Sequence, residues 1–147
     1  MWPVVFLSMV ATVTTIYVLE VEADRQQLIN LSTTQTDVLS LMAYREAAIK
    51  YLNANPSATG SVSDAGLAPY FPHGYVNPGH WNNTISAGRL YVYTSKKIDT
   101  NLLREKFYRS LMVGRKQSGL LVSLSGQATS ITIPAVVPSN AIVIVGS

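Results

Sequence analysis

The first nineteen residues contain no charged side chain, and no other feature of the sequence restricts the possible structures as strongly. As an α-helix this run would be roughly 28 Å long, about the thickness of a bilayer's hydrocarbon core. Pro3 lies near the first turn, where helices tolerate proline, and Trp2 and Tyr17 lie where aromatic residues mark the two membrane interfaces. The sequence therefore predicts a transmembrane segment over residues 1–19.

A cleaved secretory signal peptide is the alternative interpretation of this run. Val21-Glu22-Ala23 offers small residues at a spacing that permits cleavage after Ala23. However, no Lys or Arg precedes the apolar run, and the run is longer than the roughly 7–15 residues of a signal-peptide core. We therefore favour an anchor that is retained. Charge does not decide its orientation, because long domains cross a membrane largely regardless of their charge.

The sequence from residue 20 to residue 55 is typical of one uninterrupted helix. No proline or glycine occurs between Pro3 and Pro56. Apolar residues recur on one side of a helical wheel. They are Leu28, Leu31, Val38, Leu41, Met42, Ile49 and Leu52. We therefore predict an amphipathic helix over residues 20–55 that continues directly from the transmembrane segment.

Two interpretations of this apolar side remain open. The helix can pack this side on its own domain, or it can bind a helix of another chain. Heptad spacing fits the second interpretation, although Gln35 and Arg45 occupy two of the eight seam positions. The Arg45 side chain can extend to water or pair with a carboxylate. The candidate protein-contact residues on this helix are Leu31, Val38, Met42, Arg45 and Ile49.

Residues 57–87 are rich in Pro, Gly, Ser and Asn, which predicts a long loop. A flexible linker would contain few aromatic residues, whereas this segment contains several with a large apolar area. They include Tyr70, Phe71, Tyr75 and Trp81. We therefore expect an ordered loop that is anchored on the domain by its aromatic side chains.

The C-terminal part alternates between strand and helix patterns. A helix is predicted over Asp99 to Val113, with Leu103, Phe107 and Leu111 in one row facing a sheet and Gly114 ending it. Runs of β-forming residues predict strands at 89–94, 120–124, 129–133 and 141–145, of which the last is strongly apolar and therefore central. The predicted fold class is α+β: the long helix packs on a small antiparallel sheet with one further helix. Residues 56–147 form one domain that the long helix completes.

Several function classes lack the residues that they need. The chain has no cysteine, which excludes disulfides, thiolate zinc sites and cysteine nucleophiles. The two histidines, His73 and His80, are not at a metal-ligand spacing. No Ser-His-Asp arrangement, phosphate-binding loop or pair of carboxylates stands out. We therefore expect no enzymatic activity, no cofactor and no metal.

Basic residues are concentrated in one part of the chain, although the net charge is only +3. Eight of the eleven Lys and Arg residues lie between Arg89 and Lys116, together with two acidic residues. No stacking motif or nucleic-acid-binding signature accompanies them. We therefore place most of these charges on the solvent face of the 99–113 helix and its exits, and expect no nucleic-acid partner.

The predicted layout resembles type IV pilins and the pseudopilins of secretion systems. The opening MWPVVFLSMVATVTTIYVLEVEADRQQ, the chain length and the HGYVNPGHW loop resemble more specifically the PilM proteins of type IVB pilus operons, which conjugative plasmids and some pathogenicity islands carry. The resemblance implies a single-pass inner-membrane component of thin-pilus assembly with a periplasmic domain and no enzymatic activity. It implies protein contacts with pilin, the inner-membrane platform or the secretin, and an oligomer is possible.

The sequence departs from true pilins at two places. Pilins carry a basic leader that ends in glycine, and a glutamate five residues into the mature chain. Here Met1 begins directly in the apolar run, and the first acidic residue is Glu20. The resemblance therefore implies a scaffold that stays in the membrane. A minor pilin-like subunit at the fibre base and a periplasmic protein cleaved after Ala23 remain the alternatives.

Overall fold

The computed structural model describes residues 35–107 and 110–146. The predicted transmembrane segment over residues 1–19 and its helical continuation as far as residue 34 lie outside the described residues. Within the described part of the chain, no helix is both long enough and apolar enough to cross a membrane.

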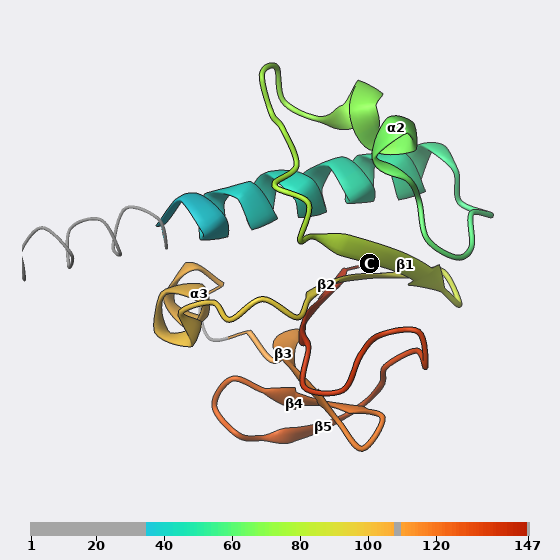
Figure 1. Cartoon of the computed structure of the whole chain (residues 1–147). Helices are drawn as coiled ribbons and strands as arrows, with labels where there is room; N and C mark the ends of the chain where they lie inside the picture. The colour runs from blue at the N-terminus through green and yellow to red at the C-terminus, as the bar shows by residue number, and fades with distance from the viewer. Residues whose placement is uncertain (1–34, 108–109, 147) are drawn as a thin grey trace, which may run out of the picture. The chain divides into compact units, whose positions relative to one another are not determined.

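The first described element is a helix over residues 35–54, drawn in teal in Figure 1. Its last turn is closed by Asn55, whose backbone N–H donates to the carbonyl oxygen of Tyr51 at 2.9 Å and whose side-chain amide donates to the same oxygen at 3.0 Å. Pro56 follows and cannot continue the helix. On the exposed side, Lys50 and Glu46 form an i,i+4 ion pair of 2.8 Å.

A six-stranded antiparallel sheet forms the rest of the core architecture (Figure 1). Its strands are β1 (Asn82–Ser86), β2 (Arg89–Thr94), β3 (Val113–Gln117), β4 (Leu120–Ser123), β5 (Ala128–Thr132) and β6 (Ile142–Gly146). Their order across the sheet is β1-β2-β6-β3-β4-β5. The four predicted strands are confirmed to within one residue at each end, and the apolar last strand is central, as predicted.

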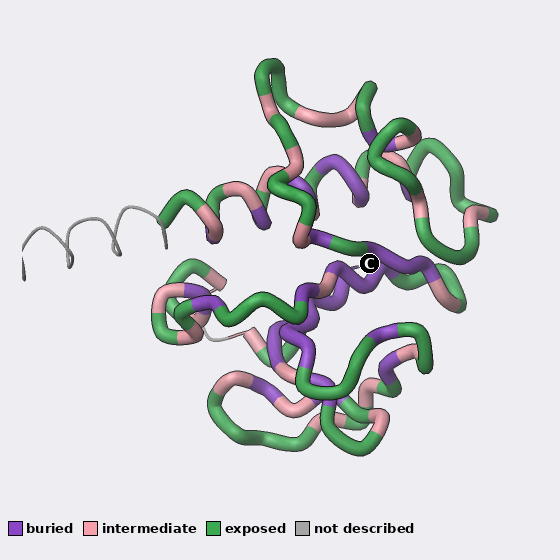
Figure 2. The backbone as a smooth tube through the Cα atoms, viewed as in Figure 1, coloured by how far each residue is buried: buried purple, intermediate pink, exposed green. Residues whose placement is uncertain are grey.

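Side chains from β6 alternate between two hydrophobic clusters on opposite faces of the sheet. Ile142 and Ile144 belong to a helix-side core, which also contains Val38, Leu41, Tyr44, Ala48 and Leu52 of the helix and Leu90, Val92, Leu103 and Val113. Val143 and Val145 belong to a loop-side core with Tyr91, Leu121, Ile133, Val137 and Ala141. The buried residues in Figure 2 accordingly follow the central strands and the inner side of the helix.

The prediction that residues 57–87 form one long loop was wrong at its C-terminal end, where β1 lies. Its register with β2 pairs Ser86 with Arg89, so the hairpin turns at Ala87 and Gly88, which have φ values of 51° and 72°. A two-residue turn of this hand matches the twist of antiparallel strands. Before β1 the chain forms only short helices, α2 (Asp64–Leu67) and η1 (Ala68–Tyr70).

The predicted helix over Asp99 to Val113 is about half as long as expected. The helix α3 spans Thr100–Lys106, and Asp99 caps it by accepting a hydrogen bond from the N–H of Asn101 at 2.8 Å. Residues from Val113 onward form β3 instead. Gly114 is therefore not a helix stop: a Cβ at this position would overlap the Val122 carbonyl of β4, so glycine permits the close approach of the two strands.

The shorter helix also changes the predicted apolar row. Leu103 is fully buried in the helix-side core, and Phe107 is half-buried against it. Leu111 is 49% exposed and lies beyond the end of the helix, so its assignment to the buried row was wrong.

We expect Leu103→Ala and Leu111→Ala to differ sharply in their effect on stability. Leu103→Ala should lower the free energy of unfolding by roughly 2–5 kcal/mol, because it leaves a cavity in the core. Leu111→Ala should change it by less than about 0.5 kcal/mol, because the side chain is exposed. Urea unfolding of the two variants measures both values, and equal losses would contradict the assigned end of α3.

Lys116 is a described basic residue between 89 and 116 that does not lie on the predicted solvent face. Its side chain on β3 is buried, with 8% of the residue exposed. Its ammonium group donates to the carbonyl oxygens of Val137 at 2.6 Å, Pro134 at 2.9 Å and Ala135 at 3.5 Å. Residues 133–141 cover the loop-side core. The hydrogen bonds of Lys116 therefore hold this segment against the sheet.

Lys116→Met should destabilise the domain, because the apolar substitute leaves buried carbonyl oxygens without a donor. A loss of roughly 1–3 kcal/mol in the free energy of unfolding is expected. Lys106→Met, at an exposed position of α3, is the matched control and should stay within about 0.5 kcal/mol of the original protein. If Lys116→Met were as mild as the control, the loop would not depend on this lysine.

Candidate protein-contact surface

The structure separates the candidate contact residues of the helix into different environments. Leu31 lies outside the described residues. Val38 is 1% exposed and belongs to the helix-side core, and Ile49 is half-buried beside Gly146 of β6. Met42 is 40% exposed. The inner side of the helix is thus used by the domain itself, and Met42 is the exposed apolar candidate.

Leu39 joins Met42 on the outer side of the helix, and the prediction from the sequence missed it. Leu39 is 60% exposed and precedes Met42 by three positions, so the two side chains are neighbours on one face. The same outer side carries the Glu46–Lys50 ion pair further along. We call Leu39 and Met42 the outer apolar pair. A leucine opposite the buried stripe of an amphipathic helix is the signal that could have found it.

Arg45 neither reaches solvent freely nor forms an ion pair among the described residues. Its guanidinium carbon lies 6.0 Å from the centre of the Phe107 ring, within the range of a cation–π interaction. Its Nε atom is buried and has no hydrogen-bond partner in the described structure. Burial lowers the pKa of Arg45 from its usual value. This arrangement ties the helix to the C-terminal end of α3.

The loop between the helix and β1, which we call the aromatic loop, is anchored through Ser40 on the early turns of the described helix. The indole N–H of Trp81 donates to the Ser40 hydroxyl at 2.9 Å, and the Tyr75 hydroxyl lies 3.1 Å from the same oxygen. Trp81 is buried, and the Phe71 and Tyr75 rings lie 4.6 Å apart against the helix-side core. The expected anchoring of this loop by aromatic side chains is therefore confirmed.

A second anchor lies deeper along the helix. The Tyr44 hydroxyl accepts a hydrogen bond of 2.7 Å from the side-chain amide of Asn83, and burial raises the pKa of Tyr44 to about 12. The same amide group also donates to the carbonyl oxygen of Val62 at 2.8 Å, and Asn83 Oδ1 accepts from the Val62 N–H at 2.8 Å. Asn83 thus joins the helix, β1 and the segment before α2.

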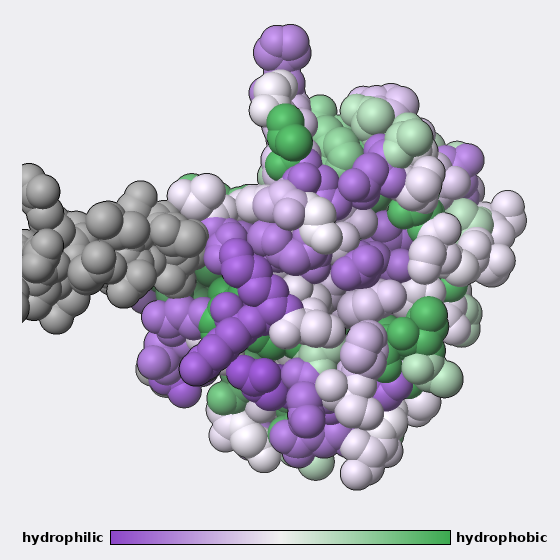
Figure 3. Space-filling model, viewed as in Figure 1, coloured by the Kyte–Doolittle hydropathy of each residue, from purple (hydrophilic) through white to green (hydrophobic). Residues whose placement is uncertain are grey.

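Asp37, Lys96 and His80 form a polar cluster that joins the helix to the segments after β2 and before β1. Lys96 Nζ lies 2.8 Å and 3.0 Å from the two carboxylate oxygens of Asp37, which connects the segment after β2 to the helix. His80 Nε2 is 3.6 Å from Asp37 Oδ1, which is too long for a hydrogen bond. Hydrophilic residues gather on this side of the molecule over α3 (Figure 3).

The surroundings of His80 shift its protonation towards the neutral form. Burial lowers the pKa of His80 below the usual 6.5, and the nearby Lys96 ammonium lowers it further. The Asp37 carboxylate and a hydrogen bond with the Pro78 backbone act in the opposite direction. Since the pKa is lower in the folded protein, the unfolded chain takes up the proton first as the pH falls.

The free energy of unfolding should therefore decrease as the pH falls below about 6.5 and through the lowered pKa of His80. His80→Asn should remove this part of the pH dependence, because asparagine does not titrate. Urea unfolding across this pH range measures the effect. His73→Asn, at an exposed histidine, is the matched control and should keep the full decrease; an unchanged profile for His80→Asn would contradict the role of His80.

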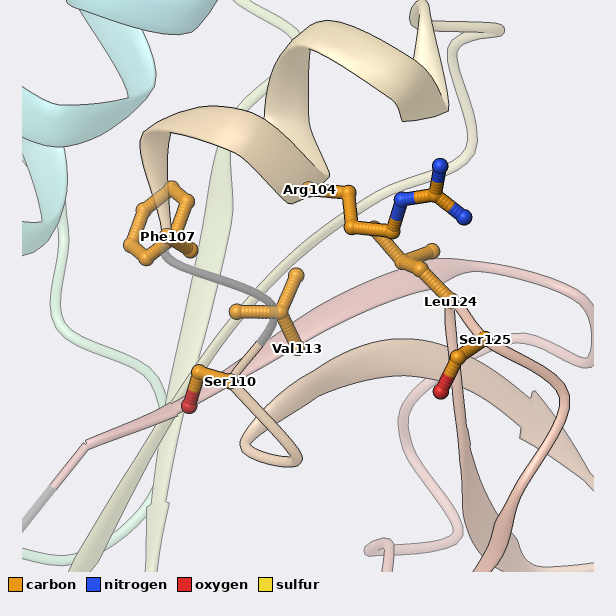
Figure 4. A pocket seen from close by; sticks show the side chains of 6 residues that line it. All are labelled: Arg104, Phe107, Ser110, Val113, Leu124 and Ser125. Atoms are coloured by element: carbon orange, nitrogen blue, oxygen red, sulfur yellow. The ribbon is translucent and has the colours of Figure 1, made fainter.

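Two pockets among the described residues differ in size and lining. The pocket in Figure 4, where Arg104 of α3 and Phe107, directly after α3, lie above Val113 and Leu124, has a volume of about 10 Å³, enough for one water molecule. A shallow groove of about 620 Å³ is lined by Leu111, Met112 and residues 127–131, none of them charged. Among the described residues, no group of three or more His, Asp or Glu side chains could hold a metal ion.

Comparison with known proteins places this fold in a family. A structure assigned as PilM from Escherichia coli B7A is similar, with 25% sequence identity, a TM-score of 0.59, and coverage of 79% of this chain and 93% of that one. A PilM structure from Pseudomonas aeruginosa 2192 has 29% identity and a TM-score of 0.46, over 77% of this chain and 92% of that one. A search of curated proteins gave no significant match. The PilM family model matches residues 6–145, and the chain therefore belongs to the PilM family.

Proposed function

We propose that this chain is a structural component of type IVB pilus assembly that acts by protein contact. Membership of the PilM family relates it to pilus biology. In this proposal residues 1–19 anchor the chain in the bacterial inner membrane, the domain lies in the periplasm, and neither catalysis nor a cofactor is involved. The partners are other assembly proteins: pilin, the inner-membrane platform or the secretin.

The outer apolar pair is the observation that carries the contact role. Leu39 and Met42 are 60% and 40% exposed on the early turns of the described helix, although the domain buries the other side of the same turns. The Glu46–Lys50 ion pair continues the same side of the helix, so the apolar pair has a polar neighbour, as the apolar centre of a contact surface has its polar rim. The pair lies on the rigid helix, which is well suited to present it to a partner.

The burial of Val38 determines which variant can test this role. A charge at Val38 would enter the helix-side core and unfold the domain, so loss of function would say nothing about docking. Leu39→Asp combined with Met42→Asp places both charges on the exposed side instead. Glu46→Gln combined with Lys50→Gln is the matched control, because it changes two exposed side chains of the same helix.

In a pilus-bearing host that lacks the native gene, the Leu39→Asp, Met42→Asp chain should accumulate normally but fail to support piliation. The Glu46→Gln, Lys50→Gln chain should restore it. Sheared pili and cell membranes are separated and probed for pilin and for this chain. Restored piliation by the Asp variant would contradict the contact role of the pair.

The same fractions decide between this proposal and its alternatives. Full-length chain in the membranes, with little in the sheared pili, is the expected result. Stoichiometric recovery of the chain in membrane-free pili would favour the minor pilin-like subunit. A soluble periplasmic form that begins at Asp24 would show cleavage after Ala23 and would overturn the anchor.

A further inference from the structure

Arg45 carries a charge that the described part of the domain does not neutralise. It lies on the side of the helix that faces the sheet, four positions after Leu41 and three before Ala48, both of which are buried. Among the described residues, no carboxylate forms an ion pair with Arg45, and its buried Nε atom has no hydrogen-bond partner. A half-buried cation without a counter-ion is unfavourable for a fold, so an apolar side chain would serve the domain better at this position.

The Phe107 ring orients the guanidinium group of Arg45 but does not neutralise it. The guanidinium carbon lies 6.0 Å from the ring centre, at the outer limit of a cation–π interaction. Nε is the one nitrogen of this group that is buried without a partner in the described structure. The two terminal nitrogens make no hydrogen bond with described residues either, and they therefore remain accessible at the edge of the helix.

Arg45 continues the row that the outer apolar pair begins. Leu39, Met42 and Arg45 follow each other at intervals of three, and residues three apart are neighbours on the surface of a helix. Leu39 and Met42 are exposed, whereas Arg45 is half-buried at the inner end of the row. A partner side chain that packs on Met42 would therefore lie within reach of the guanidinium group.

We propose that the terminal nitrogens of Arg45 bind a carboxylate of an assembly protein that packs on the outer apolar pair. This inference rests on the proposed function and names the chemistry of the partner: an acidic side chain flanked by apolar residues. The planar guanidinium group can donate two parallel hydrogen bonds to a carboxylate. The last turn of α3, with Arg104 and Lys106 on either side of Glu105, adds net positive charge nearby. A densely anionic membrane surface fits less well, because the exposed Glu46 beside Arg45 would repel it.

Arg45→Met separates a contact role from a structural one. Methionine keeps much of the length of the side chain and can pack on the Phe107 ring, so the urea midpoint of the full-length variant in detergent should not fall. In a pilus-bearing host that lacks the native gene, the number of pili should fall about tenfold, because the loss of a hydrogen-bonded charge pair weakens binding by roughly that factor. Lys106→Met removes an exposed charge beside the same ring and is the matched control, which should support normal piliation.

Arg45→Lys reports on the carboxylate directly. Lysine keeps the positive charge, so the contact should persist in part, and a carbodiimide joins an amine to a carboxylate as an amide only where the two groups touch. In membranes of the pilus-bearing host, the introduced lysine should become linked to an Asp or Glu of an assembly protein, which mass spectrometry of the linked peptides identifies. The link should be absent when Arg45→Lys is combined with Leu39→Asp and Met42→Asp.

The outcomes separate this inference from the proposed function. A lowered urea midpoint for Arg45→Met would make Arg45 a structural residue and overturn the inference. A link from position 45 only to carboxylates of this chain would also overturn it, and loss of piliation without any link would indicate a phosphate, such as a lipid headgroup, in place of a carboxylate. Normal piliation by Arg45→Met, while the Leu39→Asp, Met42→Asp chain fails, would overturn this inference alone. Normal piliation by both variants would overturn the contact role as well.

Discussion

The central strand β6 has apolar side chains on both faces, and the rest of the domain depends on covering both of them. The helix over residues 35–54 covers one face and supplies five side chains to the helix-side core. Residues 133–141 cover the other face, although they form an irregular segment. A segment without regular structure needs hydrogen bonds from other residues to hold its backbone in place. Lys116 supplies them by donating to three carbonyl oxygens of this segment.

This requirement also limits which surfaces remain for partners. Because the inner side of the helix is committed to the sheet, Val38 and Leu41 are not accessible to another chain. The loop with the aromatic residues covers a further part of the helix, since Ser40 binds both Trp81 and Tyr75. Among residues 35–54, the large apolar side chains that remain exposed are those of the outer apolar pair. The proposed contact would therefore use a small area of a rigid element.

The sequence predicted those parts of the fold in which local pattern and tertiary environment agree. β2 and β6 are rich in β-forming residues, and Asp99 is a good helix cap, so these elements were found. β1 and β3 were missed because Asn82-Asn83 and Gly114-Arg115-Lys116 are poor strand sequences by themselves. Their pairing with β2, β4 and β6 overrides this local preference.

The contact residues were predicted less well, for a related reason. A helical wheel identifies the apolar stripe of a helix but not how wide its buried part is. Met42 was expected on the buried side, but Tyr44, Ala47 and Ala48 are buried there and Met42 is exposed. The burial of Lys116 could not be read from charge alone, because it depends on carbonyl oxygens of a segment about twenty residues later in the sequence. Such pairings are properties of the assembled fold.

The position of β6 has a consequence for the order of folding. β6 is the last strand along the chain, yet it lies between β2 and β3, which do not pair with each other. The β1–β2 hairpin and the β3–β4–β5 meander can form early from neighbouring residues, whereas the two halves can be joined only after residues 142–146 have emerged from the ribosome. Until then β2 and β3 each present an open edge. The domain must therefore complete its core late, and the emerging chain would first contain two separate half-sheets.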